Sequence, residues 1–252
     1  MKPIGAIVVF LVMWQVIVVL FSIPSFTLPT PLAIFDRMVS DWTLLLTNAW
    51  TTLRVILAGF SAAVVGGMIL ATVIVHSRFV RETLYPLLVA SQLVPQVAIA
   101  PLLTIWFGIG DLPKVIVAFL ISFFPMVVNT SRGMAGVNED LIYLMRGLNA
   151  STWQILWKIR IPNALPMVFA GMRISITLAV IGAVVGEFVA GSSGLGYLVF
   201  VGTANIDTRL TFSAIAWLSV LGLVLFGLVV WAEHFAVPWA RSMEEPHRRA
   251  RR

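Results

Sequence analysis

The chain has 252 residues, of which 60% are hydrophobic and 11% are charged. A soluble domain carries about 25% charged residues, so this composition excludes an ordinary soluble domain and indicates an integral membrane protein. The absence of cysteine excludes disulfides and thiolate metal sites. The formal charge of +6 could indicate binding to nucleic acid. The length fits a single transmembrane domain, residues 1–252, with no room for an added ATPase.

Six apolar segments are predicted to cross the membrane, since a helix needs about 20 apolar residues to span a bilayer. They are residues 4–23, 49–75, 84–107, 113–134, 167–190 and 210–234. The first is predicted to be a retained anchor, because no small-residue cleavage site follows it. Residues 32–48 are more polar and are expected at the outer surface, and the basic tail 241–252 is predicted to be disordered. The fold class is therefore an all-α integral membrane protein with six transmembrane helices.

Lysine and arginine set the predicted orientation, because cytoplasmic loops are enriched in both. Six spans place both termini on one side together with the 138–166 loop. That side collects twelve basic residues and the other side four. The positive charge is thus expected to anchor loops at the cytoplasmic face rather than to bind nucleic acid, and both termini are predicted to be cytoplasmic.

The stretch 138–166 interrupts two apolar runs with polar, aromatic and basic residues. Asn138 is a good N-cap, and the two acids after it suit a first helical turn. Asn149 is expected to end this helix, because asparagine tolerates the left-handed conformation. One apolar face is formed by Leu141, Leu144, Met145 and Leu148.

A second short helix is predicted directly after the first. Ser151 and Gln154 form a capping box, and the helix is expected to end before Pro162. Two short amphipathic helices joined by a sharp elbow outside the bilayer indicate a docking surface. Periodicity alone leaves open an ordinary interfacial loop that lies on lipid headgroups.

The segment resembles the cytoplasmic coupling loop of ABC-importer permeases. The matching residues are Ala150-Ser151, Trp153-Gln154, Ile161-Pro162, Ala164-Leu165-Pro166 and Gly171. Tyr143-Leu144-Met145 replaces the family's Glu-Ala-Ala, and Asn149 replaces its glycine. Further similar strings are Pro101-Leu102-Leu103, Trp106-Phe107-Gly108-Ile109-Gly110, Phe124 to Thr130, Gly186-Glu187-Phe188 and Gly194-Leu195-Gly196-Tyr197-Leu198.

The resemblance is to the branch that carries nitrate, taurine, aliphatic sulfonates and thiamine or pyrimidine precursors. It implies a type I importer permease of the bacterial inner membrane with the coupling loop between helices 4 and 5. It also implies a cytoplasmic ABC ATPase that binds the ATP, an extracytoplasmic substrate-binding protein and a second permease copy, expected as a homodimer in membrane lipid. The residues that correspond to the coupling contact are Tyr143, Leu144, Met145, Arg146, Leu148, Asn149, Ala150 and Ser151.

Polar side chains inside the predicted spans are candidates for a translocation path, because their burial in lipid is costly. They are Gln92, Gln96, Ser122, Asn129, Thr177 and Glu187. The alternative is that they form hydrogen bonds between helices of one bundle. Solute specificity is expected to reside largely in the binding protein. A small heterocycle is slightly favoured over a strong anion, because the candidate path holds no cluster of cations.

No catalytic, cofactor or metal site is predicted in this chain. The glycine-rich residues 191–196 follow a membrane helix and lack a lysine, which disfavours a phosphate loop. Ser193 follows the fifth span on the outer side, whereas His234 closes the sixth span on the inner side, so the two cannot form a catalytic dyad. The remaining alternative function is an ion- or proton-coupled carrier that acts alone, with Glu187 as the single acid well inside a span.

Overall fold

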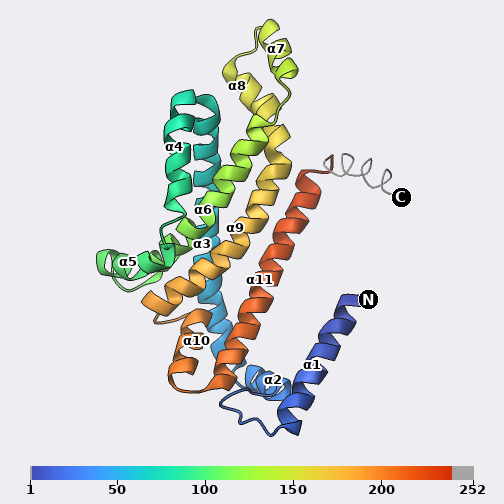
Figure 1. Cartoon of the computed structure of the whole chain (residues 1–252), viewed down its shortest axis with the longest axis vertical. Coiled ribbons are helices and arrows are strands. Elements are labelled where there is room, and N and C mark those ends of the chain that lie inside the picture. The colour runs from blue at the N-terminus through green and yellow to red at the C-terminus, as the bar shows by residue number, and fades with distance from the viewer. Residues whose placement is uncertain (1, 240–252) are drawn as a thin grey trace.

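The computed structural model describes residues 2–239. In that range the chain forms helices joined by turns and no strands, so it is all-α as predicted (Figure 1). In chain order the elements are α1 (Lys2–Leu20), α2 (Pro31–Ser40), α3 (Trp42–His76), α4 (Arg78–Ser91), η1 (Gln96–Ile99), α5 (Ala100–Phe107), α6 (Asp111–Ala135), α7 (Glu139–Gly147), α8 (Thr152–Ile155), η2 (Leu156–Arg160), α9 (Ile161–Ala190), α10 (Leu195–Ala204) and α11 (Thr208–Ala236). The predicted tail 241–252 lies outside the described residues.

Four helices in the described part of the chain are long and apolar enough to cross a membrane. They are Trp42–His76, Asp111–Ala135, Thr152–Ala190 and Thr208–Ala236. The predicted span 84–107 is not one straight helix, because α4 and the η1–α5 segment meet at 81°. Pro95 stands at this break, where proline removes an N–H donor and forces the preceding residue out of helical geometry. Counting the bent pair as one span gives up to five, and α1 is an apolar helix shorter than the long spans. The total of six spans therefore stays a prediction.

The centre of the bundle is α6, which packs between α3 and α9. Glycines allow the closest approach. A Cβ built on Gly59 of α3 would lie 2.6 Å from the Cβ of Ala118, and one built on Gly182 of α9 would lie 2.6 Å from its Cα. Small residues that let backbones approach are the usual means of packing helices in a membrane. Ala118 is therefore the point at which three helices are held together.

Replacing Gly182 by valine is expected to push α9 away from α6. The yield of protein in the monodisperse peak on size-exclusion chromatography in detergent should therefore fall to a small part of the wild-type yield. Overpacking of this kind destabilises by about 1–3 kcal/mol or more. Gly227→Val on α11 is the matched control, because a Cβ there meets no atom within 4 Å. Equal yields from the two variants would contradict the tight three-helix contact.

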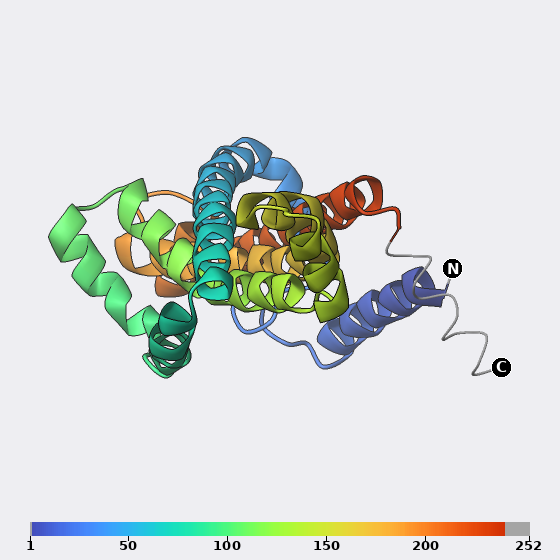
Figure 2. The same ribbon diagram turned by 90° about the horizontal axis from the view of Figure 1, so that it is seen from above.

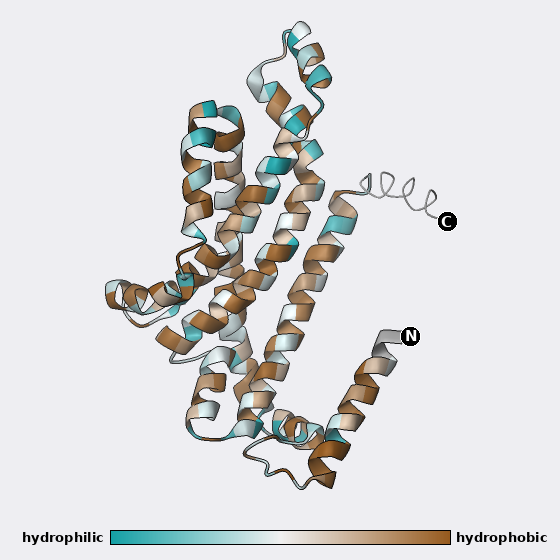
Figure 3. Cartoon of the chain, in the orientation of Figure 1, coloured by the Kyte–Doolittle hydropathy of each residue, from teal (hydrophilic) through white to brown (hydrophobic). Residues whose placement is uncertain are grey.

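The first helix diverges from the bundle, as two perpendicular views show (Figures 1 and 2). It leans on the lower end of α11 through the rings of Trp14 and Phe212, whose centroids are 5.8 Å apart. At the opposite end of the molecule, α7 and α8 project beyond α4 and the long helices. Figure 3 shows hydrophobic residues along most of α3, α9 and α11, with hydrophilic residues gathered on α7, α8 and the adjoining ends of α4 and α6.

Candidate coupling surface and translocation path

The first helix of the elbow, α7, begins and ends as predicted. The Asn138 Oδ1 accepts a hydrogen bond from the Asp140 N–H at 2.9 Å, which caps its start. Asn149 has φ 57°, the left-handed conformation that ends a helix. The Asn149 N–H donates to the Arg146 carbonyl at 2.9 Å, and the Ala150 N–H donates to the Met145 carbonyl at 3.0 Å. These bonds satisfy carbonyls at the end of the helix and fix the direction of the chain.

The second helix begins with the predicted capping box. The Gln154 N–H donates to the Ser151 Oγ at 3.2 Å, and the Ser151 N–H donates to the Gln154 side-chain oxygen at 2.8 Å. On the same helix the rings of Trp153 and Trp157 meet edge to face, with centroids 5.7 Å apart. The elbow is therefore held by local bonds on both sides of Asn149.

The prediction that this second helix ends before Pro162 is wrong. The helix continues from Thr152 to Ala190 as one element of 39 residues. A π-helical segment, η2, replaces the expected break, and the Ile161 N–H donates to the Leu156 carbonyl five residues earlier. A π turn widens the helix and shifts its hydrogen-bond register, so the missing N–H of Pro162 falls where the pattern is already changing. The elbow is consequently joined to α9 without a loop.

The outer face of the elbow exposes large apolar side chains. Tyr143 is 65% exposed, Leu148 69% and Trp153 66%. Of the predicted coupling residues, those exposed are Tyr143, Leu144, Arg146, Leu148, Asn149 and Ser151, while Met145 and Ala150 are half-buried. The predicted contact residues included neither Trp153, which was noted only as part of the loop match, nor Trp157, although their spacing of four residues on a helix indicates one face.

The two predicted glutamines flank the bend of the third span. Gln92 is the exposed residue that follows α4, and Gln96 begins η1 and is half-buried. Their spacing of four residues predicts one turn of a straight helix within the span 84–107, and this prediction is wrong because the chain bends between them.

Two further predicted path residues lie on α6 and face α9. The Ser122 hydroxyl donates to the Ala118 carbonyl at 2.6 Å, and the Ser122 carbonyl accepts from the Ser175 hydroxyl of α9 at 2.7 Å. Asn129 is half-buried, and its amide donates to the Pro125 carbonyl at 2.8 Å. Ser122 is fully buried within the subunit, whereas Asn129 keeps part of its surface free.

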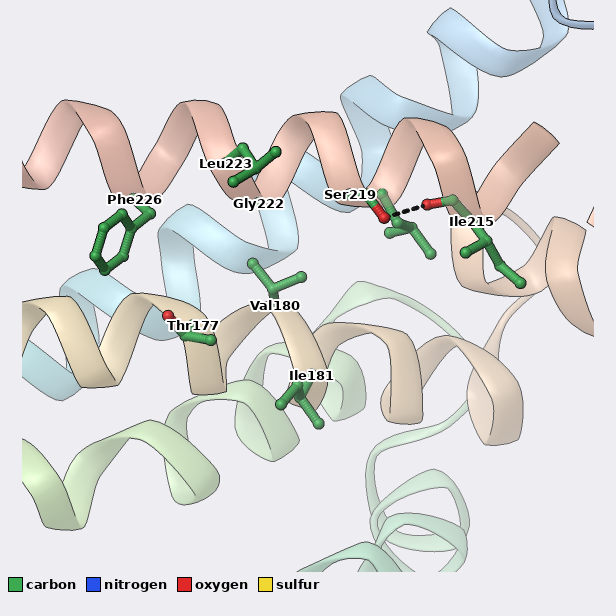
Figure 4. A pocket seen from close by; sticks show the side chains of 9 residues that line it. Thr177, Val180, Ile181, Ile215, Ser219, Gly222, Leu223 and Phe226 are labelled. Carbon is green, nitrogen blue, oxygen red and sulfur yellow. Dashed lines mark hydrogen bonds between the residues drawn. The ribbon is translucent and has the colours of Figure 1, made fainter. Parts of the chain in front are cut away.

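Thr177 lies in an open groove between α9 and α11 (Figure 4). The groove has a volume of about 350 Å³ and is mostly apolar. Its hydroxyl groups belong to Thr177 and Ser219, which donate to the Arg173 and Ile215 carbonyls of their own helices at 3.1 and 2.9 Å. Thr177 is exposed, so its side chain is free to meet a molecule that enters the groove.

Glu187 is fully buried and holds the start of α10. One carboxylate oxygen accepts a hydrogen bond from the Thr52 hydroxyl at 2.8 Å, and the other accepts from the Gly196 N–H at 2.7 Å. The Thr52 oxygen in turn accepts from the Leu195 N–H at 2.8 Å. Backbone N–H groups at a helix start lack partners within the helix, so a buried helix start needs such acceptors.

The glycine-rich turn before α10 is bonded to two other helices as well. The Asn48 side chain of α3 accepts from the Gly194 N–H at 2.7 Å. The buried Lys114 ammonium of α6 donates to the Ser193 carbonyl at 3.4 Å and pairs with Asp111 at 3.1 Å. Sequence reasoning missed Asn48, Thr52 and Lys114, since no local signal links them to the turn.

The chain matches the family model described as binding-protein-dependent transport system inner membrane component over residues 63–235. It is 39% identical over 234 residues to the riboflavin transport system permease protein RibX of Chloroflexus aurantiacus, covering 92% of this chain and 87% of that one. It is 33% identical to the formylaminopyrimidine transport permease protein ThiX of Halalkalibacterium halodurans, with 96% and 97% covered. With the taurine transport system permease protein TauC of Escherichia coli it shares 30% identity, with 88% and 83% covered.

The fold resembles a chain in the solved structure of the inward-facing MetNI methionine ABC transporter. The TM-score is 0.68 at 16% sequence identity, and the match covers 78% of this chain and 98% of that one. At this identity the likeness shows the fold alone, which is the type I permease fold.

Proposed function

Because the chain belongs to the binding-protein-dependent transport system inner membrane component family, we propose a mechanism by which this permease subunit of an ABC importer moves a small solute. The observation that supports it is the continuous helix from Thr152 to Ala190, which joins the exposed elbow directly to the core of the bundle. At 1.5 Å per residue this helix is about 58 Å long, long enough to carry a displacement through the whole membrane.

The proposed motor is a separate cytoplasmic ATPase, since we assign no ATP site to this chain. The apolar outer face of α7 and α8 seats in a groove of that ATPase, and closure of the ATPase subunits moves α9 and, through the Ala118 contact, α6. Two copies of the permease, fed by an extracytoplasmic binding protein, then alternate between outward- and inward-open shapes. The twelve basic residues on the elbow side, against four on the other, support a cytoplasmic elbow and cytoplasmic termini.

The proposed path is lined by polar side chains that keep exposed surface, namely Gln92, Gln96, Asn129 and Thr177. Ser122 and Glu187 are buried in the subunit. Ser122 joins α6 to α9, and Glu187 joins α9 to α3 and α10, so both support the path from behind. Amides and hydroxyls suit an uncharged polar solute. The names of RibX and ThiX refer to heterocycles, and we propose a cargo of the thiamine- or pyrimidine-precursor class, with a sulfonate such as taurine as the second candidate.

An ion- or proton-coupled carrier acting alone is the competing function, and one uptake experiment separates the two. In proteoliposomes that hold the permease, its ATPase and the binding protein, uptake of labelled solute is expected to require ATP on the elbow side. A proton gradient without ATP is expected to give no uptake above that of empty vesicles. Uptake that is driven by the gradient in vesicles lacking the ATPase would overturn the proposal.

A further inference from the structure

A second cavity, with a more polar lining, lies at the base of the elbow, away from the path. It is open to the surface, has a volume of about 380 Å³ and is bordered by the ends of α3, α4, α6 and α7 and by η2. Three arginines from three different elements line it, namely Arg81 of α4, Arg132 of α6 and Arg160 of η2. Glu139 of α7 is the acid that lines the same cavity. The chain thus brings together positive charge from sequence positions far apart.

The guanidinium groups of the three arginines have no carboxylate partner within 4.0 Å and no hydrogen-bond partner in the described part of the chain. Four other arginines in the described residues are paired: Arg37 with Asp41 and Asp207, Arg54 with Asp111, Arg78 with Glu82, and Arg173 with Glu233. Arg146 of α7 adds a further like charge beside Arg160. One glutamate does not balance this charge, so the cavity is suited to an anion from outside the chain.

Three guanidinium groups around one cavity favour a phosphate group as the ligand. Guanidinium groups bind phosphate oxygens through paired, charge-assisted hydrogen bonds. A water molecule takes about 30 Å³, so this cavity has room for a phosphate with its ester groups. Apolar and aromatic residues complete the lining, namely Ile74, Val75, Tyr85, Val137 and Ile142. These walls suit the carbon chain of an ester better than a free ion.

We propose that this cavity binds a phosphate group, and that its source is the phosphodiester of an anionic phospholipid. All three arginines lie where spans end on the elbow side, which is the level of lipid headgroups. Basic pockets between helices on the cytoplasmic side are a known mode of anionic-lipid recognition. The assignment to the inner leaflet rests on the proposed orientation of the transporter, whereas the binding itself does not.

The test is retention of lipid by the purified full-length permease in complex with its ATPase. After exchange into phosphatidylglycerol or phosphatidylcholine micelles, native mass spectrometry is expected to show about one phosphatidylglycerol per permease and little phosphatidylcholine. Arg132→Gln combined with Arg160→Gln is expected to lower that retention at least tenfold. Arg78→Gln is the matched control, because Arg78 lies at the same end and is exposed, as Arg81 and Arg132 are, but it does not line the cavity and is paired with Glu82. Two single variants at position 160 are also compared. Arg160→Lys, which keeps the charge, is expected to retain more phosphatidylglycerol than Arg160→Gln.

A second arm separates the sources of phosphate. If millimolar inorganic phosphate raises the melting temperature of the wild type but not of the double variant, and phosphatidylglycerol does not, the phosphate site holds and the lipid source is overturned. Equal retention by wild type, control and cavity variants overturns the site itself. The phosphate site is also overturned if the wild type retains no lipid and the cavity variants lose the ATPase. In that case the arginines bind a carboxylate of the ATPase. If the double variant does not fold, Arg81→Gln alone gives the same comparison.

Discussion

Asn149→Pro is expected to abolish ATP-driven uptake while the permease remains inserted in the membrane. Proline holds φ near −65°, whereas Asn149 has φ 57°. Proline also removes the N–H that donates to the Arg146 carbonyl at 2.9 Å. The direction of the elbow is lost, but the contacts of α3, α6 and α9 are not touched. Uptake in proteoliposomes should fall to that of vesicles without ATP.

Asn149→Gly is the matched control for this variant, because glycine adopts the left-handed conformation without strain. It is expected to keep solute-stimulated ATP hydrolysis within about twofold of the wild type, since it preserves the turn. Comparable membrane levels of both variants on a blot show that insertion is equal. Normal stimulated hydrolysis in the proline variant would mean that the elbow does not transmit force.

Gly194→Ala is expected to disrupt the start of α10 and to lower the yield of folded protein. Gly194 has φ +116°, a conformation that costs other residues about 1–3 kcal/mol. A Cβ at this position would overlap the carboxylate of Glu187, which is buried and already bonded to Thr52 and Gly196. A shift of the carboxylate away from this Cβ strains or breaks its bonds with Thr52 and Gly196. The melting temperature in detergent should fall well below that of the wild type.

Gly108→Ala isolates the part of this effect that comes from the carboxylate. Gly108 also has a positive φ, +79°, but a Cβ there meets no atom within 4 Å. It is expected to lose only the backbone strain energy of about 1–3 kcal/mol. If both variants melt at the same temperature, the buried network around Glu187 contributes nothing to the stability of the turn.

The elbow was predictable because its signals are local. The N-cap at Asn138, the left-handed Asn149 and the box of Ser151 with Gln154 each depend on residues within five positions. The predicted stop at Pro162 is wrong because a π segment precedes the proline and lets the helix continue. Leu156 of this segment packs in one buried cluster with Met126 and Met134 of α6, a contact that a local rule does not include.

The interior of the bundle could be predicted only in outline. Hydropathy places the long spans, but it does not give the 81° angle between α4 and the η1–α5 segment at Pro95, after which α5 packs against α6. Glu187 was identified as unusual, yet its partner Thr52 lies 135 residues away in sequence and belongs to another helix. Which distant polar side chains pair depends on the tertiary structure, so it cannot be predicted from the local sequence around either residue.

The most direct test of the mechanism is site-specific cross-linking of Leu148, because the natural chain has no cysteine to interfere. Leu148→Cys, at an exposed position of the elbow, is expected to cross-link to the ATPase subunit in the assembled transporter. It should also resist an impermeant maleimide added outside intact cells. Ile206→Cys, equally exposed at the far end of the bundle, should show the reverse. Labelling of Leu148→Cys from outside, or its failure to reach the ATPase in a complex that hydrolyses ATP, would contradict the proposed coupling.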